Sequence, residues 1–149
     1  MAAHMHASAR DVLERLHQAL NRHDLAAFLA SFDPEYRSEQ PAHPNRGFGG
    51  REQVEKNWAA LFSGIADFHA ELLASAADRD TIWAEWRWSG TRVGQPPLDM
   101  SGVTLFGVDN GLITWGRLYM EEVEAAGEDI DQTVRRLARG PTEAERTDT

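Results

Sequence analysis

The chain has 149 residues, an apolar fraction of 42%, a net charge of −9 at pH 7 and no cysteine. Its length fits one domain, and its acidic balance argues against nucleic acid or an anionic membrane as a partner, because no basic run is present to neutralise phosphate groups. The lack of cysteine excludes disulfides and thiol catalysis and is compatible with a cytoplasmic protein, and no apolar run is long enough to span a membrane.

The first part of the chain is mostly helical in its patterning. Ser8, followed by Asp11, is typical of a capped helix start, and Asp24 is placed to cap a second helix that ends before Pro34. Apolar residues then recur at helical spacing. We expect helices over residues 8–21, 25–32 and 51–62, with a short strand at 35–40 and a loop at 41–50.

The second part of the chain is rich in β-formers. Asn110-Gly111 supplies the positive backbone angles of a tight hairpin. We expect strands over residues 67–76, 81–89, 98–108 and 112–121. Segregated helices and strands predict an α+β domain. It spans residues 8–124, followed by a helical extension over 125–140 and a disordered tail over 141–149. We interpret residues 1–5 as a cloning scar before a start at Met5.

Several stretches resemble a known family. They are the element order, the short strand that stops at Pro41, the run Gly49-Gly50-Arg51-Glu52 and the closing run Asp109-Asn110-Gly111-Leu112-Ile113-Thr114-Trp115. Over residues 8–124 the chain resembles a SnoaL-like domain of the nuclear transport factor 2-like superfamily. The resemblance implies a cone-shaped α+β barrel, with three N-terminal helices packed on a bent antiparallel sheet. It does not fix a function, because this superfold hosts cyclases, isomerases, hydrolases, dehydratases and non-enzymatic binders.

The catalytic positions of these relatives carry non-catalytic residues here. Gln40 stands where ketosteroid isomerase-like members have an aspartate before the proline, and an amide cannot act as a general base. Leu118 stands at the base position of limonene epoxide hydrolase-like members, on the strand where polyketide cyclases place their acid/base aspartate. Trp86 and Trp88 stand at the arginine and aspartate positions of the hydrolases. We therefore expect epoxide hydrolysis to be absent.

By this alignment the even-numbered residues of the last three strands face a cavity that Trp58 and Phe62 close. Such a set suits a flat hydrophobic ligand, although an ordinary core filled by its own side chains is the alternative. A slip of one residue would instead bring Glu85 and Arg87 inside. The expected inward residues are Ala84, Trp86, Trp88, Met100, Gly102, Thr104, Phe106, Leu118 and Met120.

A polar group is expected at the cavity mouth. Arg37 and Glu39 share one side of their strand, and His43 follows in the loop. A buried carboxylate has a raised pKa and can move protons, and histidine titrates near neutral pH. The alternatives are a surface salt bridge and an exposed loop histidine. Two functions stay open: a module that binds a small hydrophobic molecule, and an isomerase, cyclase or hydrolase that uses Glu39 and His43.

The odd-numbered residues form the other face of the sheet. We expect a homodimer through Trp115, Arg117 and Tyr119, because large aromatic residues lie on the side that the helices do not cover. A solvated outer face is the alternative. No metal or cofactor is expected, because the six histidines are scattered and no His-Glu-x-x-His pattern occurs. The face comprises Glu85, Arg87, Asp99, Val103, Leu105, Ile113, Trp115, Arg117, Tyr119 and Glu121.

Overall fold

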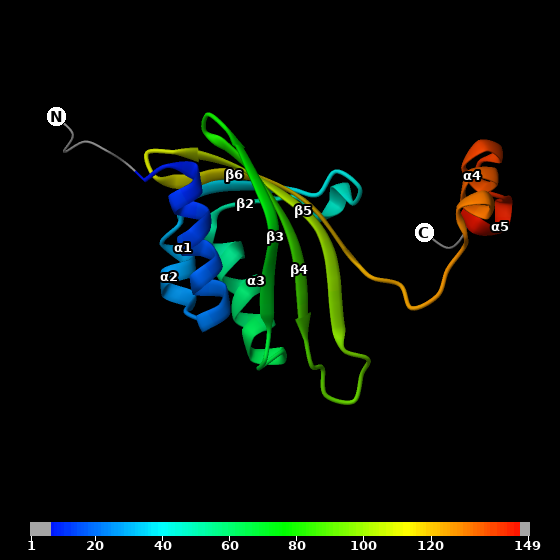
Figure 1. The fold of residues 1–149 in the computed structure, drawn as a ribbon, viewed down its shortest axis with the longest axis horizontal. Coiled ribbons are helices and arrows are strands. Elements are labelled where there is room, and N and C mark those ends of the chain that lie inside the picture. Colours follow the sequence, from blue (N-terminus) through cyan, green and yellow to red (C-terminus); the bar gives the residue numbers. More distant parts are fainter. Residues whose placement is uncertain (1–6, 147–149) are drawn as a thin grey trace.

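The computed structural model describes residues 7–146, so the expected cloning scar at residues 1–5 lies outside the described residues. Five α-helices are described: α1 (Ala9–Arg22), α2 (Leu25–Leu29), α3 (Arg51–Gly64), α4 (Ile130–Arg139) and α5 (Glu143–Arg146). The strands are β1 (Phe32–Glu39), β2 (Phe48–Gly49), β3 (His69–Asp78), β4 (Thr81–Gly90), β5 (Leu98–Asp109) and β6 (Leu112–Glu122). They form one sheet in the order β2-β1-β6-β5-β4-β3. Figure 1 shows this sheet bent around α1, α2 and α3, which confirms the α+β class.

The helix starts follow the expected capping chemistry. The Asp11 backbone N–H donates to Ser8 Oγ at 3.2 Å, and the Ser8 backbone N–H donates to Asp11 Oδ2 at 3.3 Å. Asp24 Oδ1 accepts from the Ala27 backbone N–H at 3.1 Å and so caps α2. The helix is shorter than expected and ends at Leu29, because Phe32 already pairs in β1.

Polar side chains of α1 and of its C-cap residue His23 form hydrogen bonds at the free edge of the sheet. Ala70 in β3 donates its backbone N–H to Asn21 Oδ1 at 2.7 Å, and its carbonyl accepts from Asn21 Nδ2 at 3.0 Å. Nε2 of His17 lies 2.8 Å from the same carbonyl, and Nε2 of His23 lies 2.7 Å from the Phe68 carbonyl. An edge strand needs such partners, because one row of its backbone groups has no neighbouring strand.

The sheet is antiparallel from β3 to β6, and the β5–β6 hairpin turns at Asn110 and Gly111 with φ angles of 52° and 78°. The four last strands are antiparallel as expected, and the short first strand β1 joins the sheet parallel to β6. The pairing of β1 with β6 shifts between Phe32 and Arg37, around Pro34. Proline lacks the N–H that a regular ladder requires, so an irregularity is expected at this position.

Burial confirms the expected parity of β4 and β5. Trp86 and Thr104 are each 1% exposed, whereas Glu85 and Arg87 face solvent. The expectation for Ile113 is wrong, because this residue is fully buried rather than on the outer face. The β5–β6 register shifts between Gly107 and Val108. Because of this irregularity, the odd-numbered Ile113 faces inward at the start of β6, whereas even-numbered residues such as Met120 face inward further along the strand.

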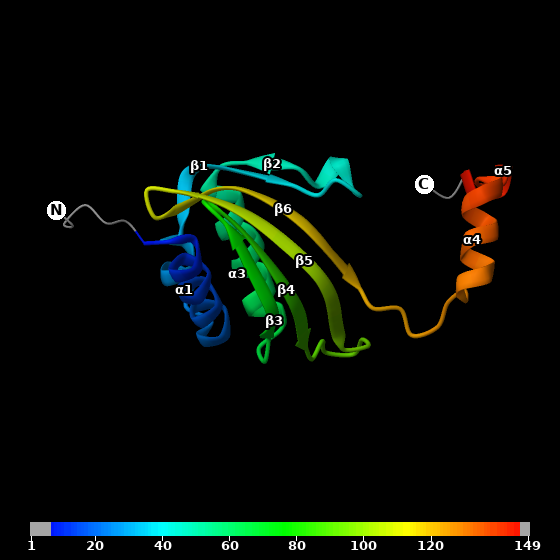
Figure 2. The ribbon, with the colours of Figure 1, turned by 45° about the horizontal axis from the view of Figure 1, so that its top comes forward.

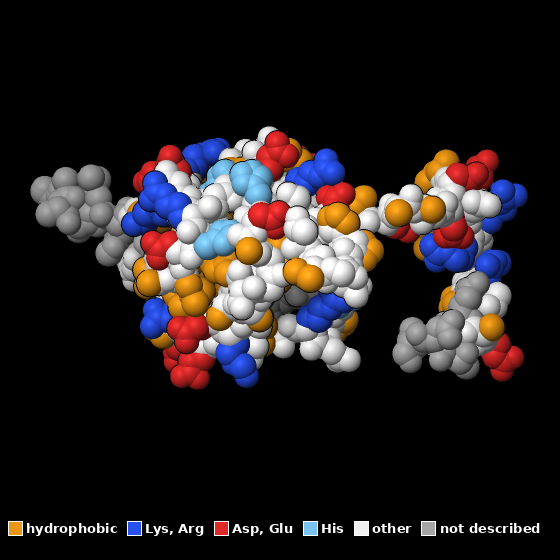
Figure 3. Space-filling view, turned by 90° about the horizontal axis from the view of Figure 1, so that it is seen from below, with side chains coloured by type: hydrophobic (Ala, Val, Ile, Leu, Met, Phe, Trp, Pro, Cys, Tyr) orange, Lys and Arg blue, Asp and Glu red, His pale blue; other side chains and the backbone are white. Residues whose placement is uncertain are grey.

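The C-terminal extension stands apart from the domain body. Figures 1 and 2 show α4 and α5 beyond the end of β6, joined to it by an extended segment. In the space-filling view of Figure 3 the same segment forms a narrow neck. Along α4, Ile130, Val134 and Leu137 form an exposed apolar stripe. Of the tail expected to be disordered over 141–149, residues 143–146 form α5 and residues 147–149 lie outside the described part of the chain.

The close approach of β5 to β6 gives a prediction for stability. A Cβ atom at Gly102 would clash with the Tyr119 carbonyl oxygen and lie 2.8 Å from Met120 Cα, so backbone atoms would have to move. We expect Gly102→Ala to lower the free energy of unfolding by about 1–3 kcal/mol. The exposed neighbour substitution Ser101→Ala should change it by less than about 0.5 kcal/mol. Equal urea midpoints for the two variants would contradict this close packing of the two strands.

Candidate functional site

A partly open cavity lies between the helices and the inner face of the sheet. Its volume is about 90 Å³. A dry cavity of roughly 150 Å³ holds benzene, so the enclosed space here limits an occupant to a molecule smaller than benzene. The lining residues are Leu16, Leu20, Phe28, Phe32, Tyr36, Ser38, Gln40, Phe48, Val54, Asn57, Trp58, Trp86, Trp88, Thr104, Phe106 and Leu118.

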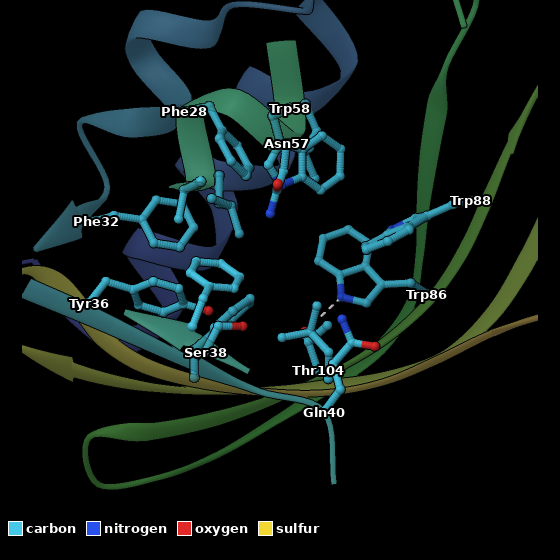
Figure 4. A pocket seen from close by; sticks show the side chains of 16 residues that line it. Phe28, Phe32, Tyr36, Ser38, Gln40, Asn57, Trp58, Trp86, Trp88 and Thr104 are labelled. Carbon is cyan, nitrogen blue, oxygen red and sulfur yellow. Dashed lines mark hydrogen bonds between the residues drawn. The ribbon is translucent and has the colours of Figure 1, made fainter. Parts of the chain in front are cut away.

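Aromatic rings make up much of the wall. The ring centroid of Trp58 in α3 lies 5.0 Å from that of Phe28 in α2 and 5.5 Å from that of Trp88 in β4. The Trp58–Trp88 pair is edge-to-face, at an interplanar angle of 78°. The Nε1–H group of Trp88 is buried without an acceptor among the described residues. This packing fixes the rings on one side of the cavity, as Figure 4 shows.

One buried hydrogen bond between two side chains of the cavity wall ties β4 to β5. Trp86 Nε1 donates to Thr104 Oγ1 at 2.9 Å, and both side chains are 1% exposed. The two residues lie on neighbouring strands, where Ala84 pairs with Thr104 and Trp86 pairs with Gly102. The bond satisfies the indole N–H, which would otherwise carry an unmet desolvation cost. It also holds the Trp86 ring in a fixed orientation at the cavity.

Two side-chain amides face the cavity with their NH₂ groups. Arg46 Nη1 donates to Gln40 Oε1 at 3.2 Å, and Gln53 Nε2 donates to Asn57 Oδ1 at 2.8 Å. Both amide oxygens are therefore engaged on the side away from the cavity. In Figure 4 the Asn57 nitrogen points towards the centre of the cavity, whereas the Gln40 nitrogen points towards the indole ring of Trp86 on the opposite side. Neither nitrogen has a hydrogen-bond partner among the described residues.

Tyr36 is the titratable residue among those that line the cavity. Burial raises the pKa of its phenol to about 12, and the hydrogen bond with the Ser38 side chain acts in the opposite direction. Tyr36 is 3% exposed and belongs to β1, next to α3 and β6. The phenol therefore stays protonated at neutral pH and cannot accept a proton there.

The structure does not bring Glu39 and His43 to the cavity. Glu39 and Arg37 are exposed on the outer side of β1 and do not line the cavity. Strand alternation sends Tyr36 and Ser38 inward instead. Nε2 of His43 lies 2.6 Å from Glu121 Oε1, in a pair whose side chains are 36% and 56% exposed.

Of the residues expected to bind a ligand, the structure places five in the cavity wall: Trp58, Trp86, Trp88, Thr104 and Leu118. Phe62 instead stacks on His23 at a centroid distance of 4.7 Å. Met100 and Met120 lie on the inner side of the sheet but outside the cavity lining. Their role in binding stays a prediction, as does that of the five residues that line the cavity.

The sequence analysis did not place Tyr36, Ser38 and Asn57 in the site. Tyr36 and Ser38 alternate with Arg37 and Glu39, so a choice of the other parity for β1 would have found them. Asn57 precedes Trp58 on α3, and no spacing rule singles it out. Among the described residues, no group of three or more histidine, aspartate or glutamate side chains is placed to hold a metal ion. No described helix is long and apolar enough to cross a membrane.

Comparison with known proteins identifies the family. The profile of the SnoaL-like domain matches residues 13–115, well over half of the chain, and the protein therefore belongs to the SnoaL-like family. No protein with a curated description matches the sequence.

Solved structures share the fold at low identity. An LEH-like epoxide hydrolase from M. tuberculosis is 19% identical, with a TM-score of 0.65 over 89% of this chain and 90% of that one. A protein from Catenulispora acidiphila with a ketosteroid isomerase-like fold, solved in complex with trimethylamine, is 20% identical, with a TM-score of 0.64 over 73% and 84%. Bal32a, from a soil-derived mobile gene cassette, is 22% identical, with a TM-score of 0.65 over 75% and 88%. These likenesses show the fold.

The buried phenol gives a pH-dependent prediction. The pKa of Tyr36 is raised from 10.0 to about 12 on folding, so its contribution to stability is complete below pH 10 and is lost as pH rises towards 12. Between pH 9 and 11.5 the unfolding free energy of the wild type should fall by about 2 kcal/mol more than that of Tyr36→Phe. Urea titrations at a series of pH values measure this difference. Parallel curves for the two proteins would show that the phenol is not buried.

Proposed function

We propose that this domain binds a small, uncharged and largely apolar molecule in the cavity, without acid–base catalysis by the side chains that line it. The observation that supports this function is the composition of the wall. Aromatic rings and neutral polar groups make up most of it, and none of the described lining residues is an aspartate, glutamate, histidine, lysine or arginine. A charged occupant would lose its hydration without an opposite charge to replace it.

The enzymatic alternative has less support. Isomerase, cyclase and hydrolase reactions that proceed by general acid–base catalysis need a base within hydrogen-bond reach of the substrate. Leu118 lines the cavity at the position aligned with the base of the epoxide hydrolases, and its side chain cannot activate water. Glu39 is exposed, and His43 pairs with Glu121 outside the cavity wall. An acid/base role for Glu39 and His43 would require a substrate bound at that outer site.

A heavy-atom ligand tests the binding function. Bromoethane is an apolar molecule smaller than benzene, and its bromine quenches indole emission on contact. We expect saturable quenching in the wild type, because Trp58, Trp86 and Trp88 all line the cavity. Leu118→Asp should weaken this binding about tenfold or more, since it places an unpaired carboxylate at an apolar wall. The control Ser101→Asp adds the same charge on the exposed side of β5. Quenching that is linear, or equally weakened by both substitutions, would refute cavity binding.

The outer face of the sheet supports a homodimer as the assembly state. Trp83 and Tyr119 are 38% and 42% exposed, and Trp83 pairs with Leu105 while Val103 pairs with Tyr119. These four side chains form a continuous apolar strip across β4, β5 and β6. The Arg117 guanidinium lies 4.8 Å from the centroid of the Trp115 ring. Arg117 therefore partly covers Trp115 within the same chain. The proposed interface thus centres on Trp83 and Tyr119 rather than on Trp115.

Sedimentation of point variants tests the dimer. We expect the wild type to show a dimer mass at micromolar concentration, and Trp83→Lys or Tyr119→Lys to show a monomer mass. A lysine in the strip would have to lose its hydration within an apolar contact. Val93→Lys is the matched control, because Val93 is 95% exposed in the loop between β4 and β5. A wild type that sediments as a monomer, or a control that dissociates equally, would exclude this interface.

A further inference from the structure

Two apolar surfaces of the chain are exposed, one on the C-terminal extension and one on the sheet. On α4, Ile130, Val134 and Leu137 recur at spacings of four and three residues, so they share one face of the helix. They are 75%, 53% and 67% exposed and form the apolar stripe of α4. On the sheet, the apolar strip that runs from Trp83 to Tyr119 crosses the outer face of β4, β5 and β6, and we call it the outer strip.

The helix α4 needs a packing surface to be stable. It has ten residues, and isolated helices shorter than about 12–15 residues are marginal in water. Ile130, Thr133 and Val134 are β-branched, which lowers its helix propensity further. The capping box between Asp129 and Gln132 satisfies backbone N–H groups at the start of α4 but leaves the stripe exposed. Burial of the stripe against another surface would supply the stabilisation that propensity and capping do not.

The stripe and the outer strip match in length. Between Ile130 and Leu137 the helix rises by roughly 10 Å, at 1.5 Å per residue. The outer strip crosses three neighbouring strands, which also span roughly 10 Å at the ordinary strand spacing. One face of α4 can therefore cover the whole strip.

The charges of the two surfaces are opposite in sign. The helix α4 carries three arginines and one aspartate, a net charge of +2, in a chain whose net charge is −9. Glu85 pairs with Val103 of the outer strip, and Glu71 lies on the same face in β3. Neither glutamate forms an ion pair with another described residue. Arg117, at the β6 border of the strip, lies over the Trp115 ring.

The path of the chain favours a second copy over the same chain as the surface that α4 covers. The Val123 backbone N–H donates to the Asp99 carbonyl at 2.8 Å, which continues the direction of β6 past its end. The segment that follows carries α4 away from the sheet (Figures 1 and 2). A second copy related by a two-fold axis presents the same outer strip, and by symmetry the contact then forms twice.

We propose that α4 packs its apolar stripe on the outer strip of a second copy of this chain, and that the second copy makes the same contact in return. This inference rests on the proposed homodimer and adds the element that each copy contributes to the interface. Trp83 and Tyr119 then pack against the α4 helix of the second copy rather than against its sheet.

Substitutions within the stripe test this contact in the full chain. Val134→Gln and Leu137→Gln remove apolar surface without weakening the helix, because glutamine forms helices about as well as leucine and better than valine. We expect each to weaken the dimer about tenfold or more in sedimentation, since both copies lose the contact. Gln132→Glu is the matched control, because it lies on the opposite face of α4 and keeps the capping box. A wild-type dimer that both stripe substitutions leave intact would overturn the contact, while a dimer through the sheet faces stands.

Cross-linking between two copies tests which chain α4 covers. The chain has no cysteine, so introduced cysteines report one pair at a time. A tagged copy carries Ala138→Cys, one turn after Val134, and an untagged copy carries Ser101→Cys, on the outer face of β5 two residues before Val103. We expect a short bismaleimide to join the two into a species of mixed mass, and Gln132→Cys to replace Ala138→Cys poorly.

Three outcomes separate the contact from the homodimer itself. Absence of the mixed species in a protein that sediments as a dimer overturns the α4 contact and leaves the homodimer in place. A link within one chain only, when Ala138→Cys and Ser101→Cys are on the same copy, shows that α4 covers its own sheet and also overturns it. A wild type that sediments as a monomer excludes the homodimer, and the contact with it.

Discussion

The pairing of β1 alongside β6 decides the chemical character of the cavity. The two strands run parallel, with a shift near Pro34, and Ser38 pairs with Gly116 in this register. Alternation then sends Tyr36 and Ser38 inward and Glu39 outward. A slip of one residue would exchange these sides and bring a carboxylate and a guanidinium into the site. The neutrality of the cavity is thus a consequence of strand register rather than of overall composition, which is strongly acidic.

Much of the fold was predictable because its signals are local. Ser8 and Asp24 cap helices by hydrogen bonds to backbone groups three residues away, and Asn110-Gly111 makes its turn without distant partners. The inward side of β4 was readable because two tryptophans spaced by two must share a face. The inward side of β1 carries the same kind of signal, since Phe32 and Tyr36 alternate with charged residues, and the prediction took the opposite parity because it started from Arg37 and Glu39. The pairing of β1 with β6 then sets this side in the fold.

The candidate site was predictable where it is apolar and unpredictable where it is polar. Apolar residues reveal their side by periodicity, so Trp86, Trp88 and Leu118 could be placed from the sequence. Gln40 was noticed for the aspartate it replaces and not for the donor it provides. Its direction depends on Arg46, which approaches from the turn at residues 44–46. Such a partner depends on loop conformation, which no spacing pattern encodes.

The same outside contacts explain how a neutral cavity can still be selective. A free amide presents a donor and an acceptor about equally well, because it can rotate to expose either end. Arg46 only donates, so it holds the Gln40 oxygen on its own side and leaves the Gln40 NH₂ group on the other side of the amide, whereas Gln53 can bond either end of Asn57. The orientation of the amide is fixed without placing a charge in the apolar space, so the cavity wall avoids the desolvation cost of a buried ion. Selectivity at this site therefore depends on residues outside the cavity wall as much as on those within it.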